Sequence, residues 1–233
     1  MRVLVTRPAG DAEDTAALLK ARGHEPLVAP LLVVRFHDGH PLHLDNVQAL
    51  LFTSANGARA FARRSSRRDF KVFAVGTQTA QAARDAGFSE VANAAGDAID
   101  LVQLVHRSCS PEGGALLHAA GAEAEGRLAR GLTEAGYAVR TDVLYDVPSV
   151  DALPDAARSA LTAEALDAVL LFSARSAAAF ADLVNKAALR ERCARLVFCC
   201  ISEAAAEPVK TFPAKAIRIA ARPNQTALLD CLG

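Results

Sequence analysis

The chain has 233 residues, with 26 basic and 26 acidic side chains and hence no formal net charge. This length allows one large domain or two small ones, and a hydrophobic fraction of 52% with 22% charged residues excludes intrinsic disorder. The balanced charge argues against a general nucleic-acid or membrane-surface binder, which needs a basic excess, but it leaves room for a local basic pocket.

Signals for export, membrane insertion and disulfide formation are missing. No stretch approaches the roughly 20 apolar residues of a membrane-spanning helix, and the N-terminal apolar run ends after Val5, too early for a signal-peptide core. The cysteines are odd in number, and Cys199 and Cys200 are adjacent inside an apolar run. This spacing fits neither a disulfide framework nor a zinc site. We therefore expect a cytoplasmic protein with reduced, mostly buried thiols.

Short apolar runs alternate with helical patterns along the whole chain. The runs lack polar alternation, which is typical of parallel strands covered on both faces. Gly23, Gly87 and Gly136 each follow a helical pattern and predict its end. Helical spacing of apolar residues is clear over 12–19, 98–105 and 180–187. In chain order, the predicted strands are Arg2–Thr6, Glu25–Ala29, Ala49–Thr53, Lys71–Val75, Glu90–Ala92, Ala115–His118, Ala138–Leu144, Ala168–Phe172, Leu196–Ile201 and Ala216–Ile219.

The order of elements occurs twice. The matching segments are 49–61 with 168–180, 72–80 with 197–205, and 2–25 with 114–138. About ten strands are too many for one sheet in a chain of this size, so the sequence predicts an α/β fold of two similar lobes, with parallel sheets flanked by helices. The default site is a cleft between the lobes. The polar, proline-containing stretches 35–45 and 145–154 are the expected crossings between them.

The residues at the carboxyl ends of the predicted strands are mainly hydroxyls and amides, with two arginines. Ligands of open α/β sheets bind at these ends, where helix N-termini present N–H groups that suit anions. We therefore expect a site for carboxylates or phosphates, built from neutral donors and a few guanidinium groups. The alternative is that Ser54, Thr77, Ser173 and Ser202 are only helix N-caps. The segments concerned are Thr6–Pro8, 53–57, 76–79, 173–176 and Ser202–Glu203.

Several familiar chemistries lack their motifs. The chain has no G-x-G-x-x-G after a first strand, no P-loop and no G-x-S-x-G, which disfavours dinucleotide and nucleoside triphosphate binding and a nucleophile elbow. His37, His40 and His43 suggest a metal site, but a proline interrupts them and no partner ligand is evident, so a solvated loop is favoured. Cys199 and Cys200 have no basic neighbour, which favours buried packing over reactivity.

Three features keep two interpretations each. His118 is expected to end a strand, where it either titrates near neutral pH or has a structural role. Tyr145 closes a strand at the expected crossing, where it either faces a flat ligand in the cleft or packs in a hinge. The run RRSSRRDF (63–70) is interpreted as a solvated helix end, with a surface anion contact as the alternative.

Short segments spread in order over nearly the whole chain form a specific combination. They are VLVTRP (3–8), LLFTSANG with Phe61, FAVGTQTA (73–80) with Gly87, GYAVRTDVLY ending in Tyr145, LLFSARSAAAF (170–180), CISEAAAE (200–207) and the terminal ARPNQTALLDCL. Together they resemble the uroporphyrinogen-III synthase family, whose members are cofactor-free enzymes of tetrapyrrole and heme biosynthesis.

The resemblance implies a fold and a reaction. The fold is two α/β lobes joined by a two-stranded linker, with a discontinuous lobe at 1–36 plus 147–233 and an inserted lobe at 37–146. The reaction is that of a hydro-lyase, which closes hydroxymethylbilane, a linear tetrapyrrole with eight carboxylates, into a ring. Water is lost and the last pyrrole ring is inverted, through an azafulvene and a spiro intermediate. Electron-rich pyrroles drive the loss of hydroxide, so neither a strong nucleophile nor a metal or other cofactor is expected.

The resemblance also carries individual residues. Tyr145 matches the family's tyrosine proposed to assist hydroxyl loss. The positions that match the substrate-binding cleft are Thr6, Arg7, Ser54, Asn56, Gly76, Thr77, Ser173, Arg175 and Ser202. Because the chain is neutral overall, attraction of the polycarboxylate has to come from local donors of this kind. We expect a monomer without nucleic-acid or membrane partners.

Some positions depart from the family pattern. Ala204 stands where relatives often have threonine, and Ala119 and Ala120 stand where they often have a basic residue. These departures keep open a catalytically inactive paralogue. A two-lobed small-molecule binding or sensor protein is the alternative from another functional class, weakened by the missing export signal and output domain.

Overall fold

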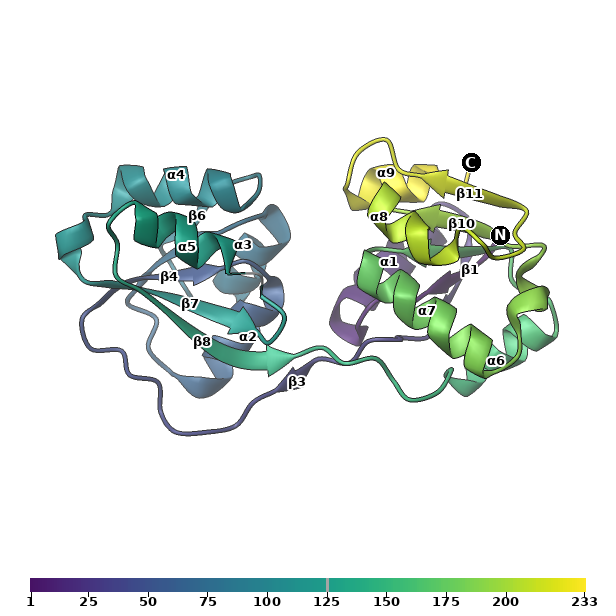
Figure 1. Cartoon of the computed structure of the whole chain (residues 1–233), viewed down its shortest axis with the longest axis horizontal. Helices are drawn as coiled ribbons and strands as arrows, with labels where there is room; N and C mark the ends of the chain where they lie inside the picture. Colours follow the sequence, from purple (N-terminus) through teal and green to yellow (C-terminus); the bar gives the residue numbers. More distant parts are fainter. Residues whose placement is uncertain (125) are drawn as a thin grey trace. The chain divides into compact units, whose positions relative to one another are not determined.

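The computed structural model describes residues 1–124 and 126–233, and the chain divides into two compact units (Figure 1). Unit 1 consists of Met1–Val33 and Pro148–Gly233, and unit 2 of Val34–Val147. Unit 2 is therefore an insertion into the sequence of unit 1.

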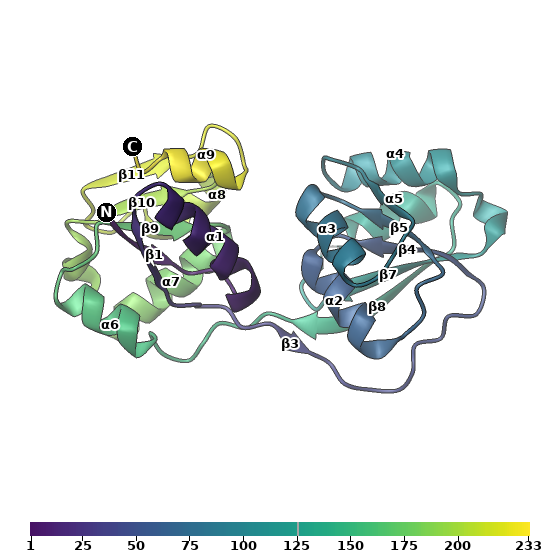
Figure 2. The same ribbon diagram turned by 180° about the vertical axis from the view of Figure 1, so that it is seen from behind.

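Unit 1 contains a five-stranded parallel sheet with helices on both faces. Its elements are β1 (Arg2–Val5), α1 (Ala9–Ala21), β2 (Glu25–Val28), α6 (Asp155–Thr162), β9 (Ala168–Leu171), α7 (Ala174–Lys186), η2 (Arg190–Cys193), β10 (Val197–Cys200), α8 (Glu203–Ala206), η3 (Glu207–Val209), β11 (Ala216–Ile219) and α9 (Gln225–Asp230). The strand order is β2-β1-β9-β10-β11. Figures 1 and 2 show α1 and α9 on one face and α7 and α8 on the other.

The core of unit 1 follows from its continuous apolar strands. The residues of β9 and β10 are buried throughout, whereas those of the edge strands β2 and β11 are partly exposed, so only the inner strands are covered on both faces as predicted. Under α7, the rings of Phe180, Phe198 and Phe212 pack together with centroids 5.6 to 6.3 Å apart. Such edge and tilted aromatic contacts are favourable in cores, and they fix α7 against β10.

Unit 2 contains a six-stranded sheet in the order β3-β8-β7-β4-β5-β6. Its elements are β3 (Arg35–Phe36), β4 (Val47–Phe52), α2 (Ala55–Arg64), β5 (Lys71–Ala74), α3 (Thr77–Asp85), β6 (Val91–Asn93), α4 (Ala98–Ser108), η1 (Pro111–Gly113), β7 (Ala115–Gly121), α5 (Arg127–Glu134) and β8 (Val139–Asp146). All strands are parallel except β3, which is antiparallel to β8. One core cluster places Phe52, Phe61 and Phe88 between the sheet and the pair α2 and α3, and the other lies under α4 and α5.

The two units share one strand order, which confirms the two similar lobes. The order β2-β1-β9-β10-β11 of unit 1 corresponds to β8-β7-β4-β5-β6 of unit 2. The register refines the repeat: Ala168 pairs with Val197 as Ala49 pairs with Lys71, so Ser202 corresponds to Gly76. The letter match of 72–80 with 197–205 had placed Ser202 opposite Thr77, one residue away.

The two chain segments at the boundary between the units pair with each other. On the unit 2 side β3 is antiparallel to β8. On the unit 1 side the Val33 amide donates to the Pro148 carbonyl at 2.9 Å, and Leu32 forms an antiparallel bridge with Ser149. The linker is therefore two-stranded, as the resemblance implies.

All ten predicted strands are present, with ends shifted by at most three residues. Two features differ from the prediction. β7 continues to Gly121, so His118 lies inside this strand rather than at its end, and the short β3 was not predicted. The three glycines do follow helices, with φ values of +77°, +96° and +90° for Gly23, Gly87 and Gly136. This left-handed conformation ends a helix and favours glycine.

The arginine-rich run 63–70 is more than a solvated helix end. Arg64 donates to the carbonyls of His37 and His40, and the second of these bonds is 2.6 Å long. Arg68 donates to the Ala86 carbonyl, at the end of α3, at 2.5 Å. The run therefore ties loops and a helix end of unit 2 together through backbone carbonyls.

The cysteines fit the expectation of buried thiols. All five are free, Cys193, Cys199 and Cys200 are buried, and burial raises the pKa of each of these three thiols to about 12. Such thiols stay protonated and are poor nucleophiles. Among the helices formed by the described residues, none combines the length and the apolar character needed to cross a membrane.

Candidate functional site

Each sheet has a topological switch point, where the helices that follow two neighbouring parallel strands pack on opposite faces. In unit 1 this point lies between β1 and β9, since α1 and α7 cover different faces; in unit 2 it lies between β7 and β4, followed by α5 and α2. Ligands of open α/β sheets bind in the crevice at the carboxyl ends of such strands. The predicted site residues follow these and neighbouring strands, divided between the two units.

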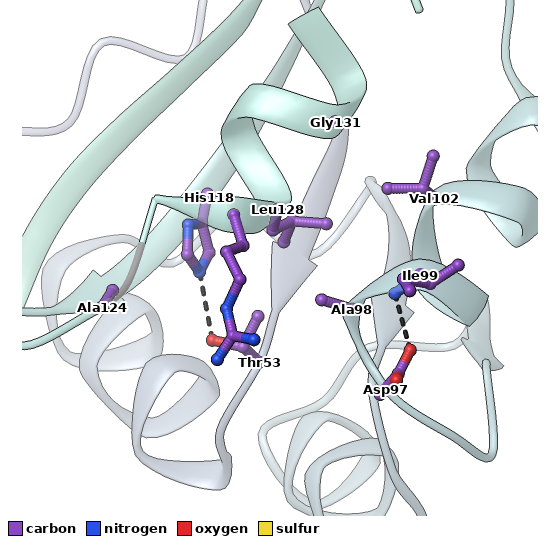
Figure 3. Close-up of a pocket in the computed structure, with 10 residues that line it drawn as sticks. Thr53, Asp97, Ala98, Ile99, Val102, His118, Ala124, Leu128 and Gly131 are labelled. Atoms are coloured by element: carbon purple, nitrogen blue, oxygen red, sulfur yellow. Dashed lines mark hydrogen bonds between the residues drawn. The ribbon is translucent and has the colours of Figure 1, made fainter. Parts of the chain in front are cut away.

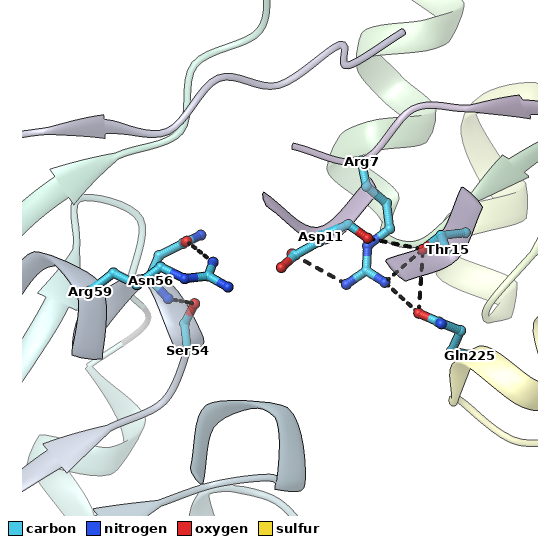
Figure 4. A network of polar contacts seen from close by, with 7 residues as sticks. All are labelled: Arg7, Asp11, Thr15, Ser54, Asn56, Arg59 and Gln225. Atoms are coloured by element: carbon cyan, nitrogen blue, oxygen red, sulfur yellow. Dashed lines mark hydrogen bonds and ion pairs between the residues drawn. The ribbon is translucent and has the colours of Figure 1, made fainter. Parts of the chain in front are cut away.

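At the switch point of unit 1, Arg7 is the centre of a polar network (Figure 4). Its guanidinium donates to Gln225 Oε1 at 2.7 Å and to Thr15 Oγ1 at 3.4 Å, and it forms an ion pair with Asp11 at 3.3 Å. It also lies over the Phe172 ring, 4.3 Å from the centroid. The side chains of Arg7 and Asp11 are only 12% and 16% exposed. The charge of Arg7 is therefore balanced inside unit 1, and the network joins β1, α1 and α9.

The other predicted residues of unit 1 lie at the same sheet edge. Thr6 is fully buried, and its hydroxyl donates to the Leu170 carbonyl of β9 at 3.0 Å. Ser173 and Ser202 are the N-caps of α7 and α8, and Ser173 shares a capping box with Ser176. Arg175, in the first turn of α7, is exposed. Capping thus occurs as the alternative interpretation stated, and it does not preclude contact with a ligand.

In unit 2 the predicted residues follow β4 and β5. Ser54 caps α2 by accepting from the Asn56 amide at 3.2 Å, and the Asn56 side chain accepts from Arg59 at 3.0 Å (Figure 4). Gly76 is the N-cap of α3 without a side-chain cap. Thr77 is the first helical residue, so the N-cap interpretation is wrong for this residue; its hydroxyl accepts from Asn93 at 3.2 Å.

Tyr145 lies near the carboxyl end of β8 and is 7% exposed. It belongs to the core cluster shared with α2, and its ring lies so close to Gly121 that a Cβ on this glycine would be 2.8 Å from the ring carbons. This packing fixes the ring on the sheet. Its role at the reacting atoms stays a prediction.

A cavity of about 560 Å³ lies at the switch point of unit 2 (Figure 3). Its polar end is formed by Thr53, which follows β4, and His118 of β7, whose Oγ1 and Nε2 atoms are hydrogen-bonded at 3.1 Å. Most of the remaining wall is apolar and comes from α4 and α5 with the chain before α5. These lining residues are Asp97, Ala98, Ile99, Val102, Ala124, Arg127, Leu128 and Gly131.

Burial determines the state of the histidine. His118 is 4% exposed, and desolvation lowers its pKa from the ordinary 6.5 to about 4. The imidazole is therefore neutral near pH 7, which contradicts the interpretation of a group titrating near neutral pH. A neutral imidazole and a hydroxyl at the end of an apolar cavity accept or donate hydrogen bonds without adding charge.

The cavity was missed at the level of sequence, although one of its residues was noted. His118 was singled out only for its titration, and Thr53 only as part of a strand end. Neither Asp97 nor Arg127 carried a sequence signal for a cavity. The D-x-x-D pattern at 97–100 is a signal only for the capping box that the structure has. Among the described residues, no group of three or more His, Cys, Asp or Glu side chains is arranged to hold a metal ion. The loop with His37, His40 and His43 thus offers no such cluster.

The available chemistry is binding and positioning. Hydroxyls, backbone N–H groups at helix starts and arginines line the strand ends, which suits carboxylates. The described cysteines are protonated and mostly buried, so no activated thiol is present among them.

Comparison with known families decides the identity of the fold. The family model described as uroporphyrinogen-III synthase HemD matches residues 13–230. The chain belongs to the uroporphyrinogen-III synthase family. This confirms the resemblance, places the chain with hydro-lyases of porphyrin and heme biosynthesis, and does not favour the sensor or inactive alternatives.

Individual relatives of this uroporphyrinogen-III synthase family member are distant. A Methanocaldococcus jannaschii protein with the provisional name uroporphyrinogen-III synthase is 37% identical over 57 residues, and the match spans 24% of either chain. The solved uroporphyrinogen-III synthetase of Helicobacter pylori is 18% identical, with a TM-score of 0.65, and is covered over 98% of its length by 100% of this chain. A mutant uroporphyrinogen III synthase of Thermus thermophilus is 19% identical, with a TM-score of 0.53, and the match covers 100% of this chain and 97% of that protein. At these identities the solved structures establish the fold.

Proposed function

We propose that the chain is a cytoplasmic, monomeric uroporphyrinogen-III synthase that closes hydroxymethylbilane into a ring with loss of water and inversion of the last pyrrole ring. The observation that carries this proposal is the family match over 13–230. Hydroxyls and helix starts at the carboxyl ends of the strands in both units support it, because the substrate bears eight carboxylates. Neither nucleic acid nor a membrane is required as a partner.

The proposed site draws on residues of both lobes, 1–36 plus 147–233 and 37–146. Each lobe contributes the residues at the carboxyl edge of its sheet: Thr6, Arg7, Ser173, Arg175 and Ser202 from one, and Ser54, Asn56, Gly76, Thr77 and Tyr145 from the other. The side chain of Arg7 is only 12% exposed and forms an ion pair with Asp11, whereas Arg175 is exposed. Arg7 therefore acts mainly by fixing the sheet edge on which Ser173 lies.

The reaction balances without a cofactor. The lone pair of the terminal pyrrole nitrogen expels the hydroxyl of the hydroxymethyl group, which takes a proton and leaves as water. The resulting azafulvene is attacked by the substituted carbon of the last ring to give the spiro intermediate. The bond from the spiro carbon to the methylene bridge of the preceding ring then breaks. The last ring rejoins this bridge through its unsubstituted α-carbon, which loses its proton, and this gives the product with the last ring inverted. Tyr145 is proposed to assist the departing hydroxyl with its own hydroxyl.

The decisive experiment supplies freshly made hydroxymethylbilane and resolves the porphyrinogen isomers. The expected product is the type III isomer. Spontaneous closure gives the type I isomer, so type I alone, at the rate seen without protein, would contradict the proposal and favour an inactive paralogue.

Tyr145→Phe tests the catalytic assignment. If the hydroxyl assists departure of water, kcat should fall about 100-fold with KM nearly unchanged, the size usual for positioned acid catalysis. The matched control is Tyr137→Phe, since Tyr137 is the other tyrosine of the chain and its hydroxyl donates to the Cys109 carbonyl at 2.9 Å. Equal kcat values for Tyr145→Phe and the unmodified protein would remove Tyr145 from the reaction.

A further inference from the structure

The cavity of unit 2 lies at the switch point of its sheet, whereas the switch point of unit 1 holds the polar network around Arg7. In the alignment of the two repeats, Gly23 corresponds to Gly136. The strand registers support this alignment, because Val3 pairs with Ala168 in unit 1 and Leu116 pairs with Ala49 in unit 2. Extended along the chain, it sets Arg7, Asp11 and Thr15 opposite Ala120, Ala124 and Leu128.

The fourth member of the unit 1 network follows the same correspondence. Gln225 is the first residue after the N-cap of α9, which follows the edge strand β11, and Ala98 is the first residue after the N-cap of α4, which follows β6. Every polar member of the network is thus replaced by an apolar residue in unit 2, and Ala98, Ala124 and Leu128 line the cavity. The four replacements concern one place in the fold, since the network residues of unit 1 lie together at its switch point.

The lining defines what fits. A volume of about 560 Å³ lies within the range of small-molecule pockets. Ala98, Val102 and Leu128 form an apolar wall that suits the face of a flat ring. At the outer end Ile99 is 67% exposed and Arg127 is exposed, which puts an apolar side chain and a cation near the opening. Asp97 is occupied as the cap of α4, accepting from the amides of Ile99 and Asp100.

The polar end suits a nitrogen-bound hydrogen. In one tautomer of His118 the Thr53 hydroxyl donates to Nε2, and in the other it accepts from Nε2–H. A hydroxyl oxygen has two lone pairs, so in either case Thr53 keeps the capacity to accept from an N–H group. A pyrrole offers one N–H on an otherwise apolar ring.

We propose that this cavity receives one pyrrole ring of the linear tetrapyrrole, with the ring N–H toward Thr53 and His118 and a carboxylate arm toward Arg127. The inference rests on the proposed function and assigns to unit 2 a ring pocket besides the strand-end donors. In unit 1 the polar network around Arg7 stands in the same place, so the proposal concerns unit 2 alone.

The test refills the cavity. The probe is a monopyrrole that carries one acetate and one propionate arm, titrated into the full-length protein with the His118 ring resonances as readout. Ala98→Leu should weaken binding at least tenfold and raise KM for hydroxymethylbilane about tenfold, which corresponds to about 1.4 kcal/mol. Ala178→Leu makes the same change at an exposed position of α7 and should alter neither value.

A second pair of variants tests the arm without refilling the cavity. Arg127→Gln should weaken the monopyrrole about tenfold, and the effect should vanish for a pyrrole lacking the acid arms. Arg130→Gln removes an exposed cation from the same helix and should leave binding unchanged. This pair keeps the proposal testable if Ala98→Leu disturbs the start of α4.

The two proposals fail separately. If the unmodified protein forms the type III isomer but the monopyrrole leaves the His118 resonances unmoved, or binds Ala98→Leu equally well, the ring pocket is wrong and the function stands. If the monopyrrole binds as expected and only the type I isomer forms, the proposed function is wrong although the pocket exists.

Discussion

Units 1 and 2 have the same strand order but fill their switch points in opposite ways. Unit 1 places Arg7, Asp11 and Gln225 there, joined by bonds of 2.7 to 3.3 Å. Unit 2 has alanines at the corresponding positions and a cavity of about 560 Å³, with His118 at its polar end. A buried polar network fixes the elements that it joins, whereas an open apolar cavity is available to a ligand.

The comparison indicates a division of labour within one duplicated fold. At the position of His118, unit 1 has Val5, and at the position of Thr53 it has Phe172, over which Arg7 lies. The two switch points therefore differ in side chains and in helix length, since α1 has 13 residues and α5 has 8, while the strand order is the same. Three predictions address this contrast.

The largest expected effect concerns the buried imidazole. The pKa of His118 is lowered to about 4 in the folded protein from an ordinary 6.5, so the unfolded chain takes up a proton first as the pH falls. The contribution of His118 to the free energy of unfolding is fully present above pH 6.5. It is lost as the pH falls from 6.5 to about 4, by about 3 kcal/mol in total at 1.36 kcal/mol per pH unit. Both tyrosines of the chain lie in unit 2 and there is no tryptophan, so tyrosine fluorescence during urea unfolding follows this unit.

The matched variant is His118→Val, which places the residue of unit 1 in unit 2. From pH 7 to pH 4 the unmodified protein should lose more unfolding free energy than the variant, because only the unmodified protein has the buried imidazole. The carboxylate titrations are common to both proteins and cancel in the difference. Asp97 and Arg127 line the same cavity and are present in both proteins, so their contributions cancel in the difference. Parallel pH profiles would show that His118 is not held neutral by burial.

The fold was predictable because its signals are local. The inner strands are unbroken apolar runs, the helices end at glycines with positive φ, and the segments 49–61 and 168–180 repeat one strand, cap and helix. The strand β3 escaped prediction because its two residues are polar or partly exposed and pair only through β8. The end of β7 escaped because Ala119, Ala120 and Gly121 resemble a loop in composition, although they are buried.

The site was less predictable because it depends on distant partners. Arg7 was recognised as a cation at a strand end, but its partner Gln225 lies 218 residues away and its ion pair with Asp11 changes its role. The cavity is produced by side chains that are small, and small residues carry no periodic or motif signal. The role of the arginines at 63–70 was not predictable for the same reason, since the carbonyls that they bind belong to other segments.

A smaller effect is expected where α2 approaches β7. A Cβ on Gly57 would lie 2.6 Å from the Ala119 carbonyl oxygen, a backbone atom that cannot turn aside. Gly57→Ala should therefore lower the unfolding free energy of unit 2 by about 2 kcal/mol, because overpacking outweighs the gain of up to about 1 kcal/mol in helix propensity. The tyrosine fluorescence transition in urea measures this loss.

The corresponding residue of unit 1 is Ser176, which carries a Cβ and whose hydroxyl donates to the Ser173 carbonyl at 2.9 Å, so unit 1 accommodates a side chain at this position. Gly126→Ala is the control, since no atom lies within 4 Å of the added Cβ, and its effect should stay within about 0.5 kcal/mol. A Gly57→Ala protein as stable as this control would show that α2 can shift away from β7 without cost.

The smallest effect separates capping from binding at Ser173. Asn and Asp both replace serine well as N-caps, whereas alanine costs about 1 kcal/mol. Circular dichroism should therefore show that Ser173→Asn and Ser173→Asp keep the stability of unit 1, which has neither tyrosine nor tryptophan, while the fluorescence transition of unit 2 stays fixed as an internal reference. If substrate carboxylates approach the start of α7, the added negative charge of Ser173→Asp should raise KM about tenfold over Ser173→Asn, a difference of about 1.4 kcal/mol. Equal KM values for the two variants would leave Ser173 as a cap of the locked unit and move the carboxylate contacts to the sheet edge of unit 2.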